Sequence, residues 1–172
     1  MNKREIDSLL QRTANGDHVA FEELYARTRR GVFAFLYTYR HNYADAEDAM
    51  QTVYLKIKNN VLSYRVGSNG LAWILQIAKN YALNELRRTK RTVSLDEVGE
   101  IACQTEFKTG DVTHTMEQVL SEEEQRIVTL HVLWKYKHRE IGELLGCPTG
   151  MVLSKYKRAV KKLKEALKEE EK

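Results

Sequence analysis

Apolar residues in the first half of the chain recur at helical spacing. One stripe follows a potential N-cap at Asp17 and repeats at intervals of three and four residues. Its members are Phe21, Leu24, Tyr25, Thr28, Val32, Phe35 and Tyr39. Similar stripes cover residues 46–57 and 71–86, and a shorter amphipathic segment covers residues 3–13. Helices with such stripes can bury one another, so the pattern predicts an N-terminal helical bundle.

The helical periodicity stops over residues 92–115, where the chain is acidic and rich in threonine. We expect a flexible linker there, because the segment is too long for a tight connection within one compact domain. Helical signals resume at Ser121, where Ser-Glu-Glu-Glu matches a capping box. The sequence therefore predicts an all-α protein with a helical domain over residues 1–91 and a small domain over residues 116–172.

The small domain has the pattern of a helix-turn-helix. HREIGELLG predicts a short helix that ends at Gly146, and Pro148 suits the start of the next helix. That next helix has an apolar stripe and an opposite basic face, the latter formed by Met151, Lys155, Arg158 and Lys162. A basic second helix can enter the major groove of DNA, while flanking lysines hold phosphates. The alternative is a lysine-rich helix that only provides a solvated surface.

Composition and charge narrow the class of protein. The 172 residues include one proline and nine glycines, which favours helices over turn-rich sandwiches. The net charge of +4 divides into +6 over residues 1–95, −8 over 96–125 and +6 over 126–172. Two separated basic blocks favour contact with a polyanion at two places, although a single charge run is more often a solvated face.

Other classes find little support. The chain has no apolar stretch long enough to cross a membrane and no signal peptide at its start, so we expect a cytoplasmic protein without membrane insertion. Cys103 and Cys147 lie outside any C-x-x-C pair, which argues against a disulfide framework or a zinc site. We expect no metal and no cofactor.

Two faces of the first domain carry candidate chemistry. An acidic face formed by Asp45, Asp48, Gln51, Thr52 and Leu55 suits a protein partner that supplies arginines, or it is plain solvated surface. A magnesium nuclease built on Asp45, Glu47 and Asp48 lacks further ligands at the right spacing. We therefore do not expect catalysis.

The third helix interleaves aromatic, amide and cationic side chains opposite its apolar stripe. They are Trp73, Ile77, Asn80, Tyr81, Asn84, Arg87 and Arg88, followed by Lys90 and Arg91. Such a face suits single-stranded nucleic acid, because bases stack on rings while cations follow the backbone. The alternative is that Trp73 and Ile77 are core residues, and for Trp73 the core interpretation is the better one. The polar loop over residues 63–70, just before this helix, is of a kind that can hold an extruded base, although glycine and asparagine are common in ordinary turns.

These segments, in this order, resemble a bacterial sigma factor of the extracytoplasmic-function group. GDHVAFEELYARTRRGVFAFLY and DAEDAMQTVYLKI resemble the family's second region, which docks on RNA polymerase. NGLAWILQIAKNYALNELRRTKR resembles the part that melts and reads the minus-ten element. LSEEEQRIVTLHVLWKYKHREIGELLGCPTGMVLSKYKRAVKKLKEAL resembles the fourth region, which reads the minus-thirty-five element. The resemblance covers residues 16–91 and 118–167 and implies promoter-specific transcription initiation by a protein that is not itself an enzyme.

The resemblance, together with neighbouring residues on the same faces, implies three sites. Polymerase docking falls on Asp45, Asp48, Gln51, Thr52, Tyr54 and Leu55. Minus-ten recognition falls on Tyr64, Arg65, Ser68, Asn69, Asn80, Asn84, Arg87, Arg88 and Arg91. Minus-thirty-five recognition falls on Arg139, Thr149, Met151, Ser154, Lys155, Arg158 and Lys162. Met151 replaces a usual threonine and Leu153 a usual basic residue, which leaves the recognised promoter sequence open.

The implied partners are bacterial core RNA polymerase, promoter DNA and an anti-sigma factor. The free protein is then expected to be a monomer, associated with the nucleoid when active or held at the membrane by its anti-sigma factor. The alternative from another class is a dimeric helix-turn-helix regulator that binds an inverted repeat without polymerase.

Overall fold

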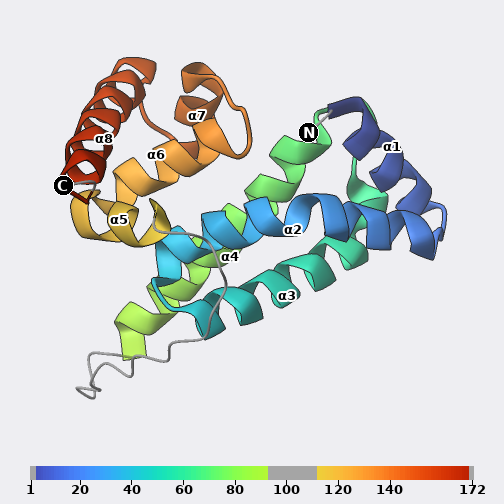
Figure 1. The fold of residues 1–172 in the computed structure, drawn as a ribbon. Coiled ribbons are helices and arrows are strands. Elements are labelled where there is room, and N and C mark those ends of the chain that lie inside the picture. The colour runs from blue at the N-terminus through green and yellow to red at the C-terminus, as the bar shows by residue number, and fades with distance from the viewer. Residues whose placement is uncertain (1–2, 93–111, 171–172) are drawn as a thin grey trace. The chain divides into compact units, whose positions relative to one another are not determined.

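A computed structural model describes residues 3–92 and 112–170, which belong to two compact units (Figure 1). Within these two stretches every regular element is a helix, which confirms the all-α prediction. The expected linker falls mostly outside the described residues, as does Cys103.

The first unit is a bundle of four α-helices. These are α1 (Lys3–Ala14), α2 (His18–Arg40), α3 (Tyr43–Asn60) and α4 (Gly70–Thr92), with a short 3-10 turn, η1 (Val61–Ser63), after α3. The long helix α2 contacts each of the other three, and α2 and α3 lie side by side (Figure 1). Helix α1 also contacts α4 and η1, so it joins the beginning of the bundle to its last helix.

Local capping sets where the helices of this unit begin and end. The carboxylate of Asp17 accepts a hydrogen bond from the Ala20 N–H at 3.0 Å, as the sequence predicted for the start of α2. His41 ends α2 in the left-handed region with φ 49°, and Asn42 caps α3 by accepting from the Asp45 N–H at 3.1 Å. The turn between α2 and α3 therefore needs only two residues.

The predicted apolar stripes form the core of the unit. Fully buried side chains include Leu24, Phe35, Ile57, Leu71 and Ile74. Each stripe therefore faces inward at the spacing that the sequence predicted, and burial of these side chains accounts for the packing of the bundle.

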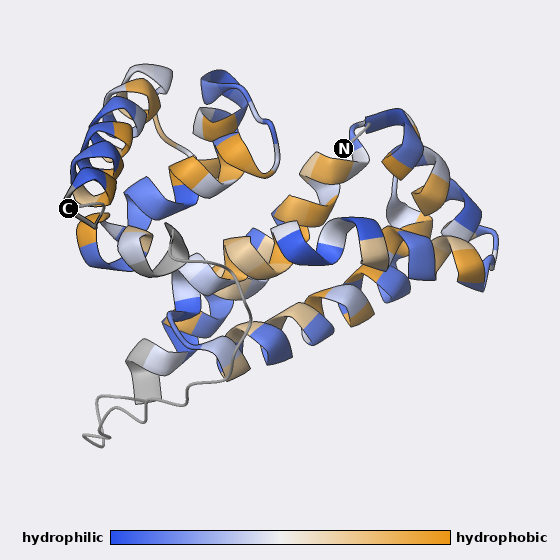
Figure 2. Ribbon diagram, in the orientation of Figure 1, coloured by the Kyte–Doolittle hydropathy of each residue, from blue (hydrophilic) through white to orange (hydrophobic). Residues whose placement is uncertain are grey.

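The second unit contains α5 (Val112–Val119), α6 (Glu122–Val132), α7 (His138–Leu145) and α8 (Thr149–Glu170). Helix α8 contacts the other three. Apolar positions on α8 gather on the side toward α6 and α7, and its outer side is hydrophilic (Figure 2). Helix α5 begins within the predicted linker, before the expected boundary at residue 116, and Thr115 is already buried in this unit.

The turn between α7 and α8 depends on two glycines. Gly146 adopts φ 73°, a left-handed conformation, and its N–H donates to the Gly142 carbonyl at 2.8 Å. A Cβ on Gly142 would lie 2.7 Å from the backbone oxygen of Cys147. The second helix can therefore approach the first closely only because position 142 has no side chain.

Candidate nucleic-acid interfaces

The acidic face of α3 is present on the surface. Asp45, Asp48 and Gln51 are exposed, and Leu55 is 62% exposed beside them, while Thr52 is half-buried. Two of these carboxylates lie in the first two turns of α3, where the helix dipole favours negative charge. The face combines carboxylates with an apolar side chain, which suits a cationic protein surface better than a phosphate backbone.

Tyr54, which the resemblance placed among the docking residues, lies beneath this face and not on its surface. It is 4% exposed, and its hydroxyl lies 2.7 Å from the Thr28 hydroxyl in the core. Its ring packs edge-on against Tyr25 at 4.7 Å between centroids. Burial raises the pKa of the Tyr54 phenol above its ordinary value. Position 54 falls on the buried side of α3, so its side chain supports the helix from inside.

Helix α4 presents a line of amide and guanidinium groups. Asn80, Asn84, Arg87 and Arg88 are all exposed, and Gln76 donates to the Asn80 side-chain oxygen at 2.9 Å. The predicted nucleic-acid face of this helix is therefore accessible. The side chain of Arg91 lies outside the described residues.

The aromatic residues of α4 lie nearer the core. Trp73, Ile77 and Tyr81 are half-buried, and the Trp73 ring lies 5.3 Å from that of Tyr64. Trp73 therefore contributes to packing, as its alternative interpretation predicted.

The loop before α4 is exposed between two anchored ends. Arg65 and Ser68 are exposed, and the Ser68 N–H donates to the Arg65 carbonyl at 3.1 Å. Asn69, at φ 79°, accepts from the Ala72 N–H at 3.4 Å and so caps α4. The loop thus has a defined shape with accessible polar groups.

Tyr64 is not one of these accessible groups. It is 8% exposed, and its hydroxyl donates to Asp7 Oδ1 at 2.6 Å. Burial, with the hydrogen bond to Asp7, raises the pKa of Tyr64 to about 12. Its contacts with Trp73 and Asp7 make Tyr64 part of the support beneath the loop, and its direct part in minus-ten recognition stays a prediction. Asp7 itself was missed, since nothing in its local sequence marks it.

The start of α8 carries the predicted recognition residues on its surface. Thr149, Ser154 and Arg158 are exposed, and Met151 is 45% exposed. Arg139 on α7 is also exposed and pairs with Glu143 at 3.2 Å. This surface offers hydroxyl, thioether and guanidinium groups, the types that contact base edges and phosphates in the major groove.

Two lysines of α8 are engaged within the unit. Lys155 pairs with Glu123 of α6, and Lys162 Nζ lies 2.8 Å from Glu124 Oε2. Glu124 is 2% exposed and closes the capping box with Ser121, as predicted from sequence. Lys162 therefore helps to hold α8 on α6, while its side chain remains 38% exposed, and its part in minus-thirty-five recognition stays a prediction. The pair with Glu124 could not be predicted, because the sequence does not show which face of α6 meets α8.

The pKa of Glu124 reflects two opposing effects. Burial raises it, but hydrogen bonds from Lys162 and from the Ser121 N–H outweigh burial and hold the pKa below its ordinary value. The carboxylate is therefore ionised at neutral pH and keeps Lys162 in place.

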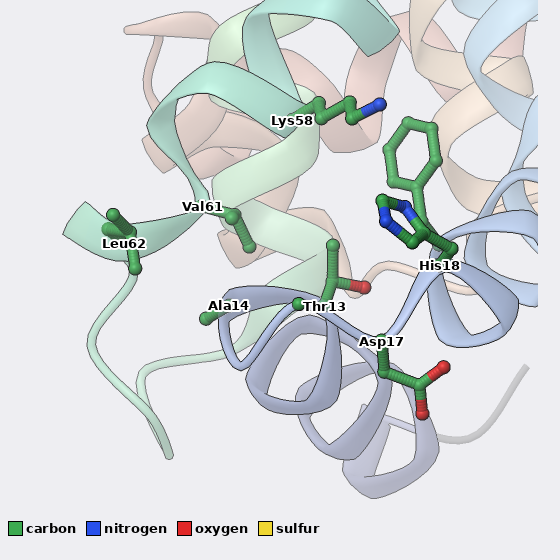
Figure 3. A pocket seen from close by; sticks show the side chains of 9 residues that line it. Thr13, Ala14, Asp17, His18, Lys58, Val61 and Leu62 are labelled. Carbon is green, nitrogen blue, oxygen red and sulfur yellow. The ribbon is translucent and has the colours of Figure 1, made fainter.

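The surface of the described residues includes two hollows. One, of 220 Å³, is formed by the α1–α2 turn and the end of α3, where Lys58 reaches over the Phe21 ring at 5.8 Å (Figure 3). The other, of 380 Å³, lies among lysines on the outer side of α8.

In the described ranges, no group of three or more His, Cys, Asp and Glu residues has the arrangement of a metal site. Over the same ranges, no helix combines the length and the apolar character that crossing a bilayer requires. Cys147 is a free thiol and is half-buried.

Comparisons with known proteins agree with the two-unit division. Residues 24–92 match the family model described as Sigma-70 region 2, and residues 111–163 match the model described as Sigma-70, region 4. RNA polymerase sigma-H factor of Pseudomonas aeruginosa is 24% identical, with 97% of this chain and 96% of that protein covered. The ECF RNA polymerase sigma-E factor of Haemophilus influenzae is 29% identical, with 88% and 89% covered.

Solved structures share the fold. The sigma factor RpoE of Bartonella quintana, solved with the anti-sigma factor NepR, gives a TM-score of 0.67 at 22% identity, over 86% of this chain and 96% of that one. CnrH, solved with the cytosolic domain of CnrY, gives a TM-score of 0.61 at 17% identity, over 95% and 97%.

Proposed function

This chain belongs to the extracytoplasmic-function group of sigma factors and directs transcription initiation, and on that premise we propose how its two units divide the work. The first unit binds core RNA polymerase and opens the minus-ten element. The second unit anchors the holoenzyme on the minus-thirty-five element. The observation that carries this division is the presence of an acidic face on α3 and an amide and arginine face on α4 in one bundle.

The acidic face of α3 is the proposed polymerase-docking surface. Asp45, Asp48, Gln51 and Leu55 are exposed there, with Thr52 at the edge. Exposed carboxylates attract arginine and lysine side chains, and Leu55 provides an apolar contact between them. Tyr54 supports this surface from the core through its hydroxyl contact with Thr28.

The DNA contacts are divided between the units. On α4, Asn80, Asn84, Arg87 and Arg88 face solvent and are proposed to hold the single strand of the minus-ten element, with the loop before α4 taking an extruded base. On α8, Thr149, Met151, Ser154 and Arg158 are proposed to enter the major groove of the minus-thirty-five element. Two weak contacts on the same DNA become strong together when the connection between them spans the sites.

The proposal also covers partners and place of action. We propose an anti-sigma partner, by analogy with RpoE of Bartonella quintana and CnrH, each solved with a binding protein. Catalysis of RNA synthesis belongs to the polymerase, so no residue of this chain receives a catalytic role. The protein acts on the nucleoid, where promoter DNA and polymerase meet. The match to sigma region 2 favours this function over a dimeric regulator, whose dimerisation would not explain the α3 and α4 faces.

Run-off transcription tests the proposal. Bacterial core polymerase is mixed with a library of linear promoter fragments, with and without the protein, and start sites are mapped. A variant with Asp48→Arg and Gln51→Ala should lose the protein-dependent transcripts. Glu22→Arg, a charge reversal at an exposed position of α2, is the matched control and should retain them.

The outcomes separate the two classes of function. Transcripts that share a pair of upstream elements, lost only in the α3 variant, support the sigma assignment of these faces. A protein that forms a dimer on a palindromic site and leaves polymerase starts unchanged contradicts it.

A further inference from the structure

One oxygen atom of α1 holds both ends of the loop that precedes α4. Asp7 Oδ1 accepts from the Tyr64 hydroxyl at 2.6 Å and from the Gly70 N–H at 2.7 Å. These two donors bracket residues 65–69. The distance across the loop's ends is therefore set by a residue far away in the sequence, on a helix outside the loop.

The hydrogen bond between Gly70 and Asp7 satisfies the start of α4, and it requires a glycine at position 70. The Gly70 N–H is the first in α4 and has no partner within the helix, so the carboxylate satisfies it and also faces the positive end of the helix dipole. A Cβ on Gly70 would lie 2.9 Å from Asp7 Oδ1 and 2.6 Å from Leu10 Cδ1. Helix α1 can approach α4 this closely only because residue 70 is glycine.

The Tyr64 contact fixes the other end. The phenol is buried against Trp73, and its hydroxyl points to Asp7. Removal of the Asp7 carboxylate would leave this hydroxyl without its acceptor. Such a loss in a buried site weakens the local structure more than the loss of a surface contact does.

Between the two anchors, the loop exposes its middle. Arg65, Val66, Gly67 and Ser68 are all exposed, Gly67 adopts φ 84°, and Ser68 Oγ donates to the Arg65 carbonyl at 2.5 Å. The loop is therefore shaped before any ligand arrives, which reduces the entropy cost of binding.

We propose that Asp7 is a positioning residue for base capture: by holding Tyr64 and Gly70, it sets the shape in which the exposed loop receives one extruded base. The inference rests on the proposed function of this loop. Asp7 does not touch the base itself.

The test uses holoenzyme formed from the full chain and core polymerase. The probes are single-stranded DNA oligonucleotides with the minus-ten sequence of a promoter identified by run-off transcription, each with one position made abasic. The variants are Asp7→Ala, Asp7→Asn and Tyr64→Phe. Glu5→Ala is the matched control, because it removes an exposed carboxylate from the same helix.

With the wild-type protein, an abasic site at the captured position should weaken binding most. Asp7→Ala should reduce the preference for a base at that one position roughly tenfold and leave the other positions unchanged. Asp7→Asn should retain most of the preference, since its amide oxygen still accepts both hydrogen bonds. Tyr64→Phe should show a smaller loss at the same position, with no further loss when combined with Asp7→Ala.

An unchanged profile in Asp7→Ala, an equal loss at every position, or the same loss in Glu5→Ala would overturn the positioning role. If Asp7→Ala unfolds, Tyr64→Phe decides, because it removes only one hydroxyl, and an unchanged profile in that variant overturns the inference. Failure of the wild-type protein to form holoenzyme is a different result, which overturns the proposed function and this inference with it.

Discussion

Lys162 Nζ on α8 lies 2.8 Å from the buried Oε2 of Glu124 on α6. The same carboxylate oxygen accepts from the Ser121 N–H at 3.0 Å. A single side chain thus closes the first turn of α6 and fixes the position of the helix that carries the recognition residues. Lys162 lies one turn beyond Arg158 and three turns beyond Met151 on the same side of α8, so this ion pair helps to hold the face that carries them.

Glu124→Gln should destabilise the second unit by about 2 kcal/mol, because Lys162 loses its charged acceptor in a largely buried site. Urea unfolding is monitored by the fluorescence of Trp134 in a Trp73→Phe background. This measures the second unit alone, since Trp134 is buried there. Glu143→Gln, at an exposed position of α7, is the control and should change little.

The same carboxylate predicts a loss of stability in acid. Because its pKa in the folded protein lies below the ordinary value of 4.5, its contribution is complete above about pH 4.5 and is lost as the pH falls below that value. In Glu124→Gln, the free energy of unfolding of the second unit should fall less steeply with decreasing pH. An equally steep decline in the variant would assign the acid sensitivity to other groups.

His138 should make the second unit weaken at mildly acidic pH. Burial, with the neighbouring His131 ring stacked at 4.7 Å, lowers the pKa of His138 below 6.5. The unfolded chain therefore binds a proton that the folded unit resists, so stability falls as the pH drops below about 6.5. His138→Phe keeps an aromatic ring and should reduce the slope between pH 7.5 and 5.5 in Trp134-monitored unfolding.

Arg158 should contribute more to DNA binding than Lys155. Arg158 is exposed and has no ion pair among the described residues, whereas Lys155 is already paired with Glu123. The measurement is the binding of holoenzyme to duplex DNA with the upstream element at several salt concentrations. Arg158→Gln should reduce the slope of log binding constant against log salt concentration by about 0.9, the effect of one phosphate contact. A larger reduction in Lys155→Gln than in Arg158→Gln would show that the Glu123 pair opens on DNA.

Gly142→Ala should destabilise the second unit by about 1–3 kcal/mol, because its Cβ would press on the Cys147 carbonyl. Gly150→Ala is a matched control on α8, where a Cβ meets nothing within 4 Å. That change should be neutral or stabilising by up to about 1 kcal/mol, since alanine favours helix over glycine. Thermal unfolding of both variants tests the pair.

Much of the fold could be predicted because its signals are local. Asp17 and Ser121 cap their helices as the sequence indicated, and the stripes through Leu24 and Leu71 are buried. Periodicity at three and four residues reports directly which side of a helix faces the core. The exposed members of the candidate faces, such as Asp48 and Arg158, follow from the same geometry.

Other features could not be predicted because they depend on contacts between distant segments. Tyrosine suits either a surface or a core, so only its neighbours decide that Tyr54 and Tyr64 turn inward. Family resemblance places a residue in a motif but does not report its burial. The pair between Lys162 and Glu124 joins α8 to α6, and Asp7 has partners 57 and 63 residues away.

The sequence distance between Asp7 and its partners has a consequence for folding during synthesis on the ribosome. Helices α2 and α3 are joined by two residues, and contacts between neighbours along the chain form early. Synthesis proceeds from the N-terminus, so α1 emerges long before Gly70 exists. We therefore expect that, within the first unit, the nascent chain forms the acidic face of α3 before it forms the loop that precedes α4. The loop takes its shape only when the start of α4 leaves the exit tunnel and reaches Asp7.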